Sequence, residues 1–222
     1  MVDRRDRPWP VKDQGSRGTC VAFAGTASHE ALRPADGELS EEFLYWGSKQ
    51  RDGLPADVDG TTLEAMGAAL SDIGQSTADQ WPYDDQTDDR AAEYGPTPEA
   101  LMDAEPRRLD DSGSIDPEPE QLIAAIDRGI LPVIGLVLFR TWHETTSDGR
   151  IGLPDPGAAP LGGHAVALVG YRSVGAATEF IVRNSWGQDW GDDGYGYLPT
   201  EYVEHYGVSA WRLELRGSTT DG

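Results

Sequence analysis

The sequence contains one cysteine, Cys20, and the residues around it favour a reactive thiol over an inert one. Cys20 lies between a Gly-rich loop and an Ala-rich segment that predicts a helix, so we expect the thiol in the first helical turn. There the helix dipole and the free backbone N–H groups favour a thiolate. A thiolate nucleophile also needs a base, a group that orients the base, and an oxyanion donor.

The base is best sought among the four histidines, and His164 is the strongest candidate. His29 lies more than two turns along the helix that begins at Cys20, so those two side chains cannot meet. His143 and His205 fall in polar stretches. His164 instead opens a strongly apolar strand, where a group able to carry charge is unusual unless it has a partner.

The expected partner of His164 is Asn184, the only asparagine in the chain. Residues 164–171 and 179–184 predict two strands joined by a hairpin centred near Val174. Antiparallel pairing in that register sets Asn184 directly opposite His164. A carboxamide there orients the imidazole without neutralising an imidazolium. The alternative, an asparagine that only caps a turn, stays open.

Gln14 lies in the loop before Cys20 and is the candidate oxyanion donor. If the loop folds back, its side-chain amide donates to an oxyanion together with the backbone N–H of Cys20. Taken alone this indication is weak, because a glutamine in a loop is usually just solvated.

Helical patterns in the first half of the chain and strand patterns in the second must position these groups. Helices are predicted from Cys20 to Pro34, after Ser40, from Thr61 or Thr62 to Asp72, and from Glu118 to Arg128. Strands are predicted at 131–139, 164–171, 179–184, 194–198 and 208–215. The fold class is therefore α+β, with two lobes and a cleft between them. We expect one domain over 1–222: a helical lobe over about 14–83, an acidic crossing segment over about 84–120, and a β lobe over about 121–216.

The composition is strongly acidic, with 39 Asp and Glu against 18 Lys and Arg and a formal charge of -21. Such a surface repels nucleic acid and disfavours binding to anionic membranes. No apolar run is long enough to span a bilayer, and no secretory signal follows the N-terminus, so a cytoplasmic location is expected. The acidity favours a solvated surface over a site that attracts a cationic substrate.

Three segments resemble active-site motifs of the papain family of cysteine peptidases, which includes the cathepsins. They are PVKDQGSRGTCVAFA, GGHAVALVGY and RNSWGQDWGDDGYGYL, and they stand in the family's order. LSEEFLY and WPYDD resemble further landmarks, so the resemblance covers most of the chain. It implies a papain-like fold with a helical lobe, an antiparallel β lobe and the active-site cleft between them. It also implies Cys20 as nucleophile, His164 as base and acid, Asn184 as orienter and Gln14 as oxyanion donor.

The same resemblance implies further positions at the substrate cleft: Gly60, Thr61, Leu136, Gly163, Ala165 and Trp186. The first two look like the cleft edge, where the backbone of a substrate would pair. Leu136 and Ala165 look like walls of the main specificity pocket. Trp186 would cover the hydrogen bond between Asn184 and His164. Gly163 stands where many relatives have Asp or Asn, so a different pH profile is expected.

The sequence also departs from the family pattern. Arg17 stands where the family has a disulfide-bonded cysteine, and Val21 stands where the family has a tryptophan. Neither change touches the reacting atoms, and the missing disulfide fits a reducing compartment or a bacterial-type relative. Gln14 is too close to the start for the family's inhibitory prosegment to fit. The chain is then a processed or excised domain, or its activity is controlled in another way.

Together these features predict a cysteine endopeptidase that acts on polypeptides and needs no metal or organic cofactor. The run of Asp189, Asp192 and Asp193 fits solvated turns better than a cation site. Two alternatives stay open: an acyl transferase or amidase that uses the same Cys–His pair, and a binding module in which the thiol is unused. Oligomeric state is not predictable from these patterns.

Overall fold

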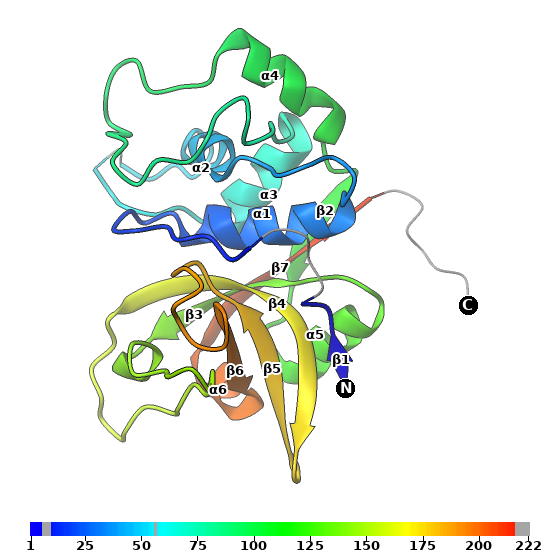
Figure 1. The fold of residues 1–222 in the computed structure, drawn as a ribbon, viewed down its shortest axis with the longest axis vertical. Coiled ribbons are helices and arrows are strands. Elements are labelled where there is room, and N and C mark those ends of the chain that lie inside the picture. Colours follow the sequence, from blue (N-terminus) through cyan, green and yellow to red (C-terminus); the bar gives the residue numbers. More distant parts are fainter. Residues whose placement is uncertain (6–9, 56, 216–222) are drawn as a thin grey trace.

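The computed structural model describes residues 1–5, 10–55 and 57–215, and the predicted end of the β lobe at 216 lies outside them. Its α-helices are α1 (Cys20–Leu32), α2 (Glu41–Lys49), α3 (Leu63–Asp72), α4 (Pro98–Ala104), α5 (Pro119–Asp127) and α6 (Thr200–Tyr206). Its strands are β1 (Val2–Asp3), β2 (Asp111–Ile115), β3 (Val133–Leu138), β4 (Gly162–Val174), β5 (Ala177–Arg183), β6 (Tyr195–Pro199) and β7 (Gly207–Glu214). Helices α1–α4 gather in one half of the molecule and most of the sheet fills the other (Figure 1).

Three of the helices, α2, α3 and α4, begin at side-chain caps that their sequences offer. The Ser40 hydroxyl accepts a hydrogen bond from the Phe43 N–H at the start of α2, and Thr62 accepts from Ala65 at the start of α3. Such caps satisfy backbone donors that a helix leaves free in its first turn. The cap of α3 fixes the segment that leads into this helix, and that segment forms one edge of the site described below.

Helix α1 begins after Thr19, but Thr19 does not cap it. Threonine is an acceptable N-cap residue, but the Thr19 Oγ1 lies 2.9 Å from the Tyr83 hydroxyl and makes no cap hydrogen bond. The Thr19 side chain therefore accepts no hydrogen bond from the backbone N–H groups of the first turn. These backbone groups lie beside the thiol, because Cys20 is the first residue of α1.

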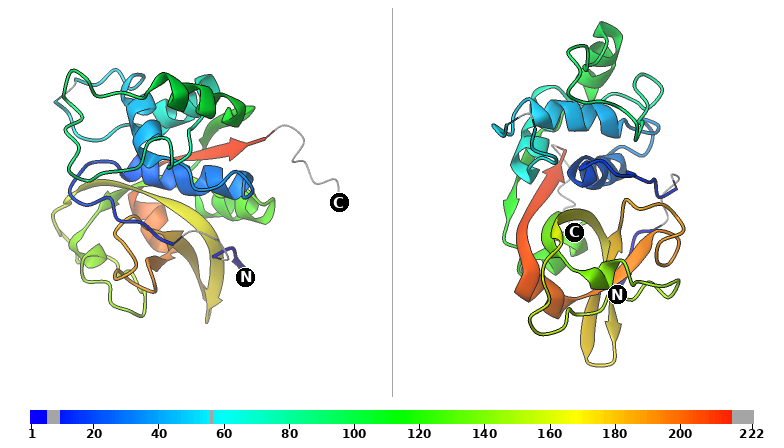
Figure 2. Two further views of the ribbon diagram at one scale, coloured as in Figure 1. Left: turned by 45° about the horizontal axis from the view of Figure 1, so that its top comes forward. Right: turned by 90° about the vertical axis from the view of Figure 1, so that its left-hand side faces the viewer.

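The strands form one antiparallel sheet in the order β2-β7-β3-β4-β5-β6, with β1 paired to β4. Figure 2 shows β7 running from the β half of the molecule toward the helices. There β2 and β7 pack against α3, so the sheet reaches into the helical half. Within the described ranges, no helix is long and apolar enough to cross a membrane.

Strand β4 lies between two hydrophobic cores because its successive side chains point to opposite faces. Val166 and Leu168 belong to a core that α5, α6 and the strands enclose. Ala165 belongs to a second core, built mainly from α1, α2 and α3. With both faces covered, β4 is almost uniformly apolar, as the sequence predicted, and its first residues emerge between the two halves.

Two stretches contain more regular structure than the sequence predicted. The acidic segment 84–120, expected to be a linker, contains α4 and β2. Helix α4 buries Ala100 and Ala104 against Phe43, and β2 pairs with β7. Alanines bury little apolar surface, so this segment carries no clear hydrophobic pattern. His205, expected in a polar linker, lies in α6.

Candidate active site

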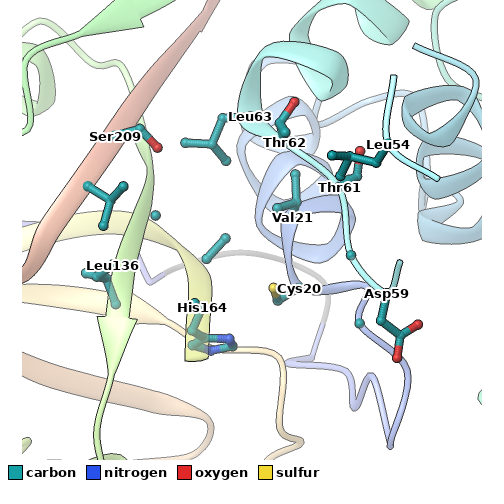
Figure 3. A pocket seen from close by; sticks show the side chains of 16 residues that line it. Cys20, Val21, Leu54, Asp59, Thr61, Thr62, Leu63, Leu136, His164 and Ser209 are labelled. Carbon is teal, nitrogen blue, oxygen red and sulfur yellow. The ribbon is translucent and has the colours of Figure 1, made fainter. Parts of the chain in front are cut away.

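A pocket of about 540 Å³ lies between the two halves of the molecule, with Cys20 and His164 in its lining. The lining comes from the start of α1, the segment before α3, and strands β3, β4 and β7 (Figure 3). Of the expected cleft residues, the following line it: Gly60, Thr61, Leu136, Gly163 and Ala165. Trp186 does not line it and lies behind His164.

Cys20 is the first residue of α1 and is partly exposed. Figure 3 shows its thiol and the His164 ring pointing toward one another from the two sides of the pocket. The thiol therefore comes from the helical half and the imidazole from the β half. The structure brings together the two side chains that the sequence singled out as candidate nucleophile and candidate base.

His164 and Asn184 form a buried hydrogen bond in which the His164 Nε2 lies 2.7 Å from the Asn184 Oδ1. The amide oxygen can only accept, so Nε2 carries the proton and donates. This fixes the tautomer of the imidazole and leaves its Nδ1 as the basic nitrogen. Nδ1 is thus the atom available to Cys20.

The two residues meet in a register that differs from the predicted one. Strand β4 pairs Ala167 with Arg183, so the hairpin is two residues out of the expected alignment. The register also shifts between Leu168 and Gly170, which marks a bulge, and β5 ends before Asn184. A displacement by two residues keeps side chains on the same face, which is why the contact forms although its predicted register is wrong.

The His164–Asn184 pair is shielded by aromatic rings. The Trp186 ring is centred 4.9 Å from the His164 ring, and the buried Trp142 ring is 5.6 Å from it. Trp186 also stacks against the exposed His143 ring, 4.8 Å away and almost parallel to it. These contacts place Trp186 where the resemblance implied, over the imidazole rather than in the pocket.

Gln14 is buried beside the site but is not among the residues that line the pocket. Its Nε2 donates to the Arg17 carbonyl at 2.7 Å, and its Oε1 accepts from the Ser185 hydroxyl. A primary amide has two N–H donors, so one of them is left for another acceptor. Ser185 was not singled out from the sequence, although it directly follows Asn184.

Burial acts on both members of the Cys–His pair. It raises the pKa of the Cys20 thiol, against the lowering effect of backbone hydrogen bonds to Ala165, Val21 and Cys20 itself. It also lowers the pKa of His164 to about 4, and the hydrogen bond to Asn184 only partly offsets this. Burial therefore opposes the thiolate that the helix N-terminus favours.

These two shifts disfavour each charge by itself rather than the two charges together. Transfer of the thiol proton to the His164 Nδ1 creates a thiolate and an imidazolium in one step. Opposite charges at short range stabilise each other, and the two groups then titrate as a pair. The geometry therefore suits a base that takes the proton of Cys20 as the thiol reacts.

Gly18 and Gly60 bring the loop before Cys20 against the edge of the pocket. A Cβ on Gly18 would lie 2.7 Å from the Gly60 backbone nitrogen, closer than such atoms approach. Gly60 itself has a φ of 87°, which a residue with a side chain rarely adopts. The close approach of the two loops therefore requires glycine at position 18, and the backbone conformation favours glycine at position 60.

Sequence reasoning missed several apolar and small residues of the pocket: Val21, Leu63, Gly135, Val208 and Ser209. Gly135 and Ser209 are partners in the pairing of β3 with β7. That pairing joins strands far apart in the sequence, so the strand patterns alone could not reveal it. Leu63 could have been suspected from its place directly after the predicted cap of α3.

Comparison with known proteins agrees with the resemblance to the papain family that the sequence shows. The family model described as papain family cysteine protease matches residues 1–212. A peptidase C1-like protein of Acanthamoeba polyphaga mimivirus is 26% identical, and the match covers 91% of this chain and 68% of the relative. Cathepsin K of Gallus gallus is 27% identical, and the match covers 90% of this chain and 58% of that protein. Several other curated relatives are matched over only about half of their length.

Solved structures agree with these sequence comparisons. Xylellain, a cysteine protease from Xylella fastidiosa, superimposes with a TM-score of 0.82 at 26% identity, over 96% of this chain and 85% of that one. Digestive procathepsin L 3 of Tenebrio molitor gives a TM-score of 0.77 at 22% identity, over 96% and 69%. The predicted α+β papain-like fold is thereby confirmed, and the chain belongs to the papain family of cysteine proteases.

Proposed function

We propose that this protein is a cysteine peptidase that hydrolyses peptide bonds through a thioester formed on Cys20. The observation that carries the proposal is that His164 faces Cys20 across the pocket while its Nε2 is held by Asn184. The chain works as one two-lobe domain, with α1 and the segment before α3 on one side of the cleft. Strands β3, β4 and β7 form the other side.

The first half of the reaction forms the thioester. The Cys20 sulfur attacks the peptide carbonyl carbon while its proton passes to the His164 Nδ1. The carbonyl electron pair moves onto oxygen, and the backbone N–H of Cys20 and the amide of Gln14 stabilise that oxyanion. When the oxyanion collapses, the C–N bond breaks and His164 returns the proton to the leaving amine.

The second half releases the product. A water molecule gives a proton to the His164 Nδ1 and attacks the thioester carbonyl, which passes through a second oxyanion. Collapse expels the Cys20 thiolate and leaves a carboxylic acid. His164 then returns its proton to the sulfur, so the enzyme ends in the state in which it began.

The pocket indicates which polypeptides suit this site. Its walls are mainly apolar, with Leu63, Leu136, Ala165 and Val208 around a space of about 540 Å³. Burial of apolar surface is the main favourable term in such a site, so we propose that an apolar substrate side chain occupies it. We also propose a reducing, cytoplasmic-type location, supported by the ion pair that Arg17 makes where the family has a disulfide-bonded cysteine.

The test compares replacements inside and outside the site. Cys20→Ser and His164→Ala should each abolish hydrolysis of a fluorogenic peptide with an apolar side chain, because the nucleophile or its base is lost. His205→Ala, which removes an exposed histidine of α6, should leave hydrolysis unchanged. Circular dichroism checks that all three variants fold. Wild-type hydrolysis rates in a folded Cys20→Ser variant would rule out the proposed chemistry.

A further inference from the structure

The loop that leads into Cys20 is held from beneath by a buried cation. The Arg17 side chain is 9% exposed, and it faces the fully buried carboxylate of Glu42 at the start of α2. Its Nη1 and Nη2 donate to the two Glu42 oxygens at 2.6 and 2.8 Å. A paired, two-bond contact of this kind fixes both the position and the plane of the guanidinium.

Further contacts complete this cluster. The Arg17 Nη1 also donates to the Asp84 carbonyl at 2.8 Å. The Tyr94 hydroxyl donates to Glu42 at 2.6 Å, on the same oxygen that the Arg17 Nη2 uses. The guanidinium lies 5.1 Å from the Tyr83 ring centre, within the range of a cation–π contact. Three segments of the helical half therefore converge on the Arg17–Glu42 pair: α2, the Tyr83–Asp84 segment and the segment that carries Tyr94.

The backbone of the same residue holds the candidate oxyanion donor. The Arg17 carbonyl accepts from the Gln14 Nε2 at 2.7 Å and from the Thr19 N–H at 2.8 Å. Tyr83, which stacks on the guanidinium, donates its hydroxyl to the Gln14 carbonyl at 2.7 Å. The side chain of Arg17 thus fixes a peptide group that aims Gln14 and leads directly into the N–H of Cys20.

We propose that Arg17, through its ion pair with Glu42, is a positioning residue that aligns the two oxyanion donors, the Gln14 amide and the Cys20 N–H. This rests on the proposed peptidase function and adds a residue to it. Arg17 touches neither substrate nor the reacting atoms, so it acts only through the loop that it holds. Oxyanion donors must lie within a few tenths of an ångström of their ideal positions, so a small shift of this loop has a large effect on rate.

Two reactions of Cys20 separate this role from general support of the fold. Peptide hydrolysis passes through an oxyanion. Alkylation by iodoacetamide does not, because the sulfur attacks a methylene carbon, the C–S bond forms and iodide leaves. Loss of oxyanion alignment therefore slows hydrolysis and spares alkylation, whereas loss of the fold or of the Cys–His pair slows both.

The variants are Arg17→Met, Arg17→Lys and a control, Arg172→Met. Lysine keeps the charge but cannot hold both Glu42 oxygens in one plane, and it is the variant more certain to fold. Arg172 pairs with Glu179 on the hairpin of β4 and β5, away from the loop, and controls for the loss of an arginine ion pair. Each variant is assayed for kcat, KM, alkylation rate and melting temperature.

We expect Arg17→Lys and Arg17→Met to lower kcat by roughly 10-fold or more, with smaller effects on KM and an alkylation rate within about twofold of wild type. Arg172→Met should lower the melting temperature without lowering kcat. In an Arg17→Lys background, Gln14→Ala should cost much less than it does in wild type, because the amide is already misaligned.

Each contrary outcome has a separate meaning. If alkylation falls in parallel with kcat, or if Gln14→Ala costs the same in both backgrounds, Arg17 only supports the fold and the proposal is wrong. If wild-type protein is alkylated at Cys20 but hydrolyses no peptide, the peptidase function itself fails, and no oxyanion remains for Arg17 to align.

Discussion

The carboxamide of Gln14 is held at both ends, by the Arg17 carbonyl and by the Ser185 hydroxyl. Such a group is aligned before the substrate arrives, so its contribution should appear only when negative charge develops on the substrate oxygen. We expect Gln14→Ala to lower kcat by roughly 10²–10³-fold with a smaller effect on KM. Steady-state kinetics with one peptide measure both constants, and a change confined to KM would make Gln14 a ground-state contact.

The Asn184 side chain contributes direction rather than charge, because its oxygen accepts from His164 without an ionic partner. Asn184→Ala removes that direction but keeps the nucleophile, the base and the oxyanion donors. We therefore expect it to reduce kcat/KM less than Cys20→Ser or His164→Ala does. Activity equal to wild type in Asn184→Ala would show that Trp186 and burial alone orient the imidazole.

A carboxylate at the same position tests the electrostatics of the pair. Burial holds the pKa of His164 at about 4, and a negative charge beside its Nε2 stabilises the imidazolium. Asn184→Asp should therefore raise the pKa of His164 and weaken it as a proton donor to the leaving amine. The alkaline limb of the pH–rate profile should move to higher pH. An alkaline limb that stays in place would indicate that the new carboxyl group is itself protonated.

At the scale of elements, α1 carries His29, a buried histidine that lies outside the candidate site. His29 is fully buried, its Nδ1 bonds to Gln75 at 2.8 Å, and burial lowers its pKa to about 4. The unfolded chain binds this proton near the ordinary histidine pKa of about 6.5. As the pH falls from that value to about 4, the unfolded state gains a proton that the folded state refuses, so stability is lost.

His29→Gln removes this titration while keeping an amide donor for Gln75. Between about pH 7.5 and about pH 4.5, wild-type protein should lose roughly 2–3 kcal/mol more unfolding free energy than the variant does. Urea unfolding at the two pH values measures the difference. Glu30 on the same helix has its pKa raised by burial to about 7, which costs stability as the pH rises from about 4.5. Comparing the two proteins cancels that effect, and equal losses would show that His29 is protonated in the fold.

Helices and strands with a strong hydrophobic pattern could be predicted from the sequence, and weakly patterned ones could not. Helices α2 and α3 begin close to where the sequence predicted, because Ser40 and Thr62 are followed by apolar residues at helical spacing. Helix α4 escaped because its buried residues are alanines, and α6 because only Tyr202 and Val203 of it are buried. A local hydrophobic pattern reveals the burial of large apolar side chains, but it says little about the burial of small ones.

The features of the candidate site likewise fall into those that the sequence could reveal and those that it could not. Cys20, His164 and Asn184 could be found because a thiol at a helix start and a hairpin are local arrangements. The register of that hairpin could not, because the turn follows Val174 instead of being centred on it, and a bulge near Leu168 then shifts the pairing by one residue. Ser209 was also beyond reach, because its place in the pocket depends on the long-range pairing of β3 with β7.

At the scale of the whole molecule, the charge balance sets how stability responds to salt. With 39 acidic and 18 basic residues, the carboxylates outnumber the basic side chains by more than two to one. Repulsion among them opposes the compact state, and salt screens that repulsion while it affects the buried Arg17–Glu42 pair much less.

We therefore expect the free energy of unfolding to rise as the sodium chloride concentration is raised at neutral pH. Urea unfolding at several salt concentrations measures this dependence, and an equal osmolality of sucrose controls for solvent effects that do not depend on charge. A fall in stability with added salt would show that surface ion pairs such as Arg140 with Glu144 outweigh the excess of negative charge.

Because Cys20 at the start of α1 is the single thiol, it also provides a unique site for labelling the protein. Any thiol-directed fluorophore or spin label attaches at Cys20 alone, since the chain contains one cysteine and it is partly exposed. No background sites have to be removed by mutation beforehand. The ratio of label to protein then gives the fraction of molecules with a reactive thiol. The attached dye reports on its surroundings in the pocket between the two halves of the molecule.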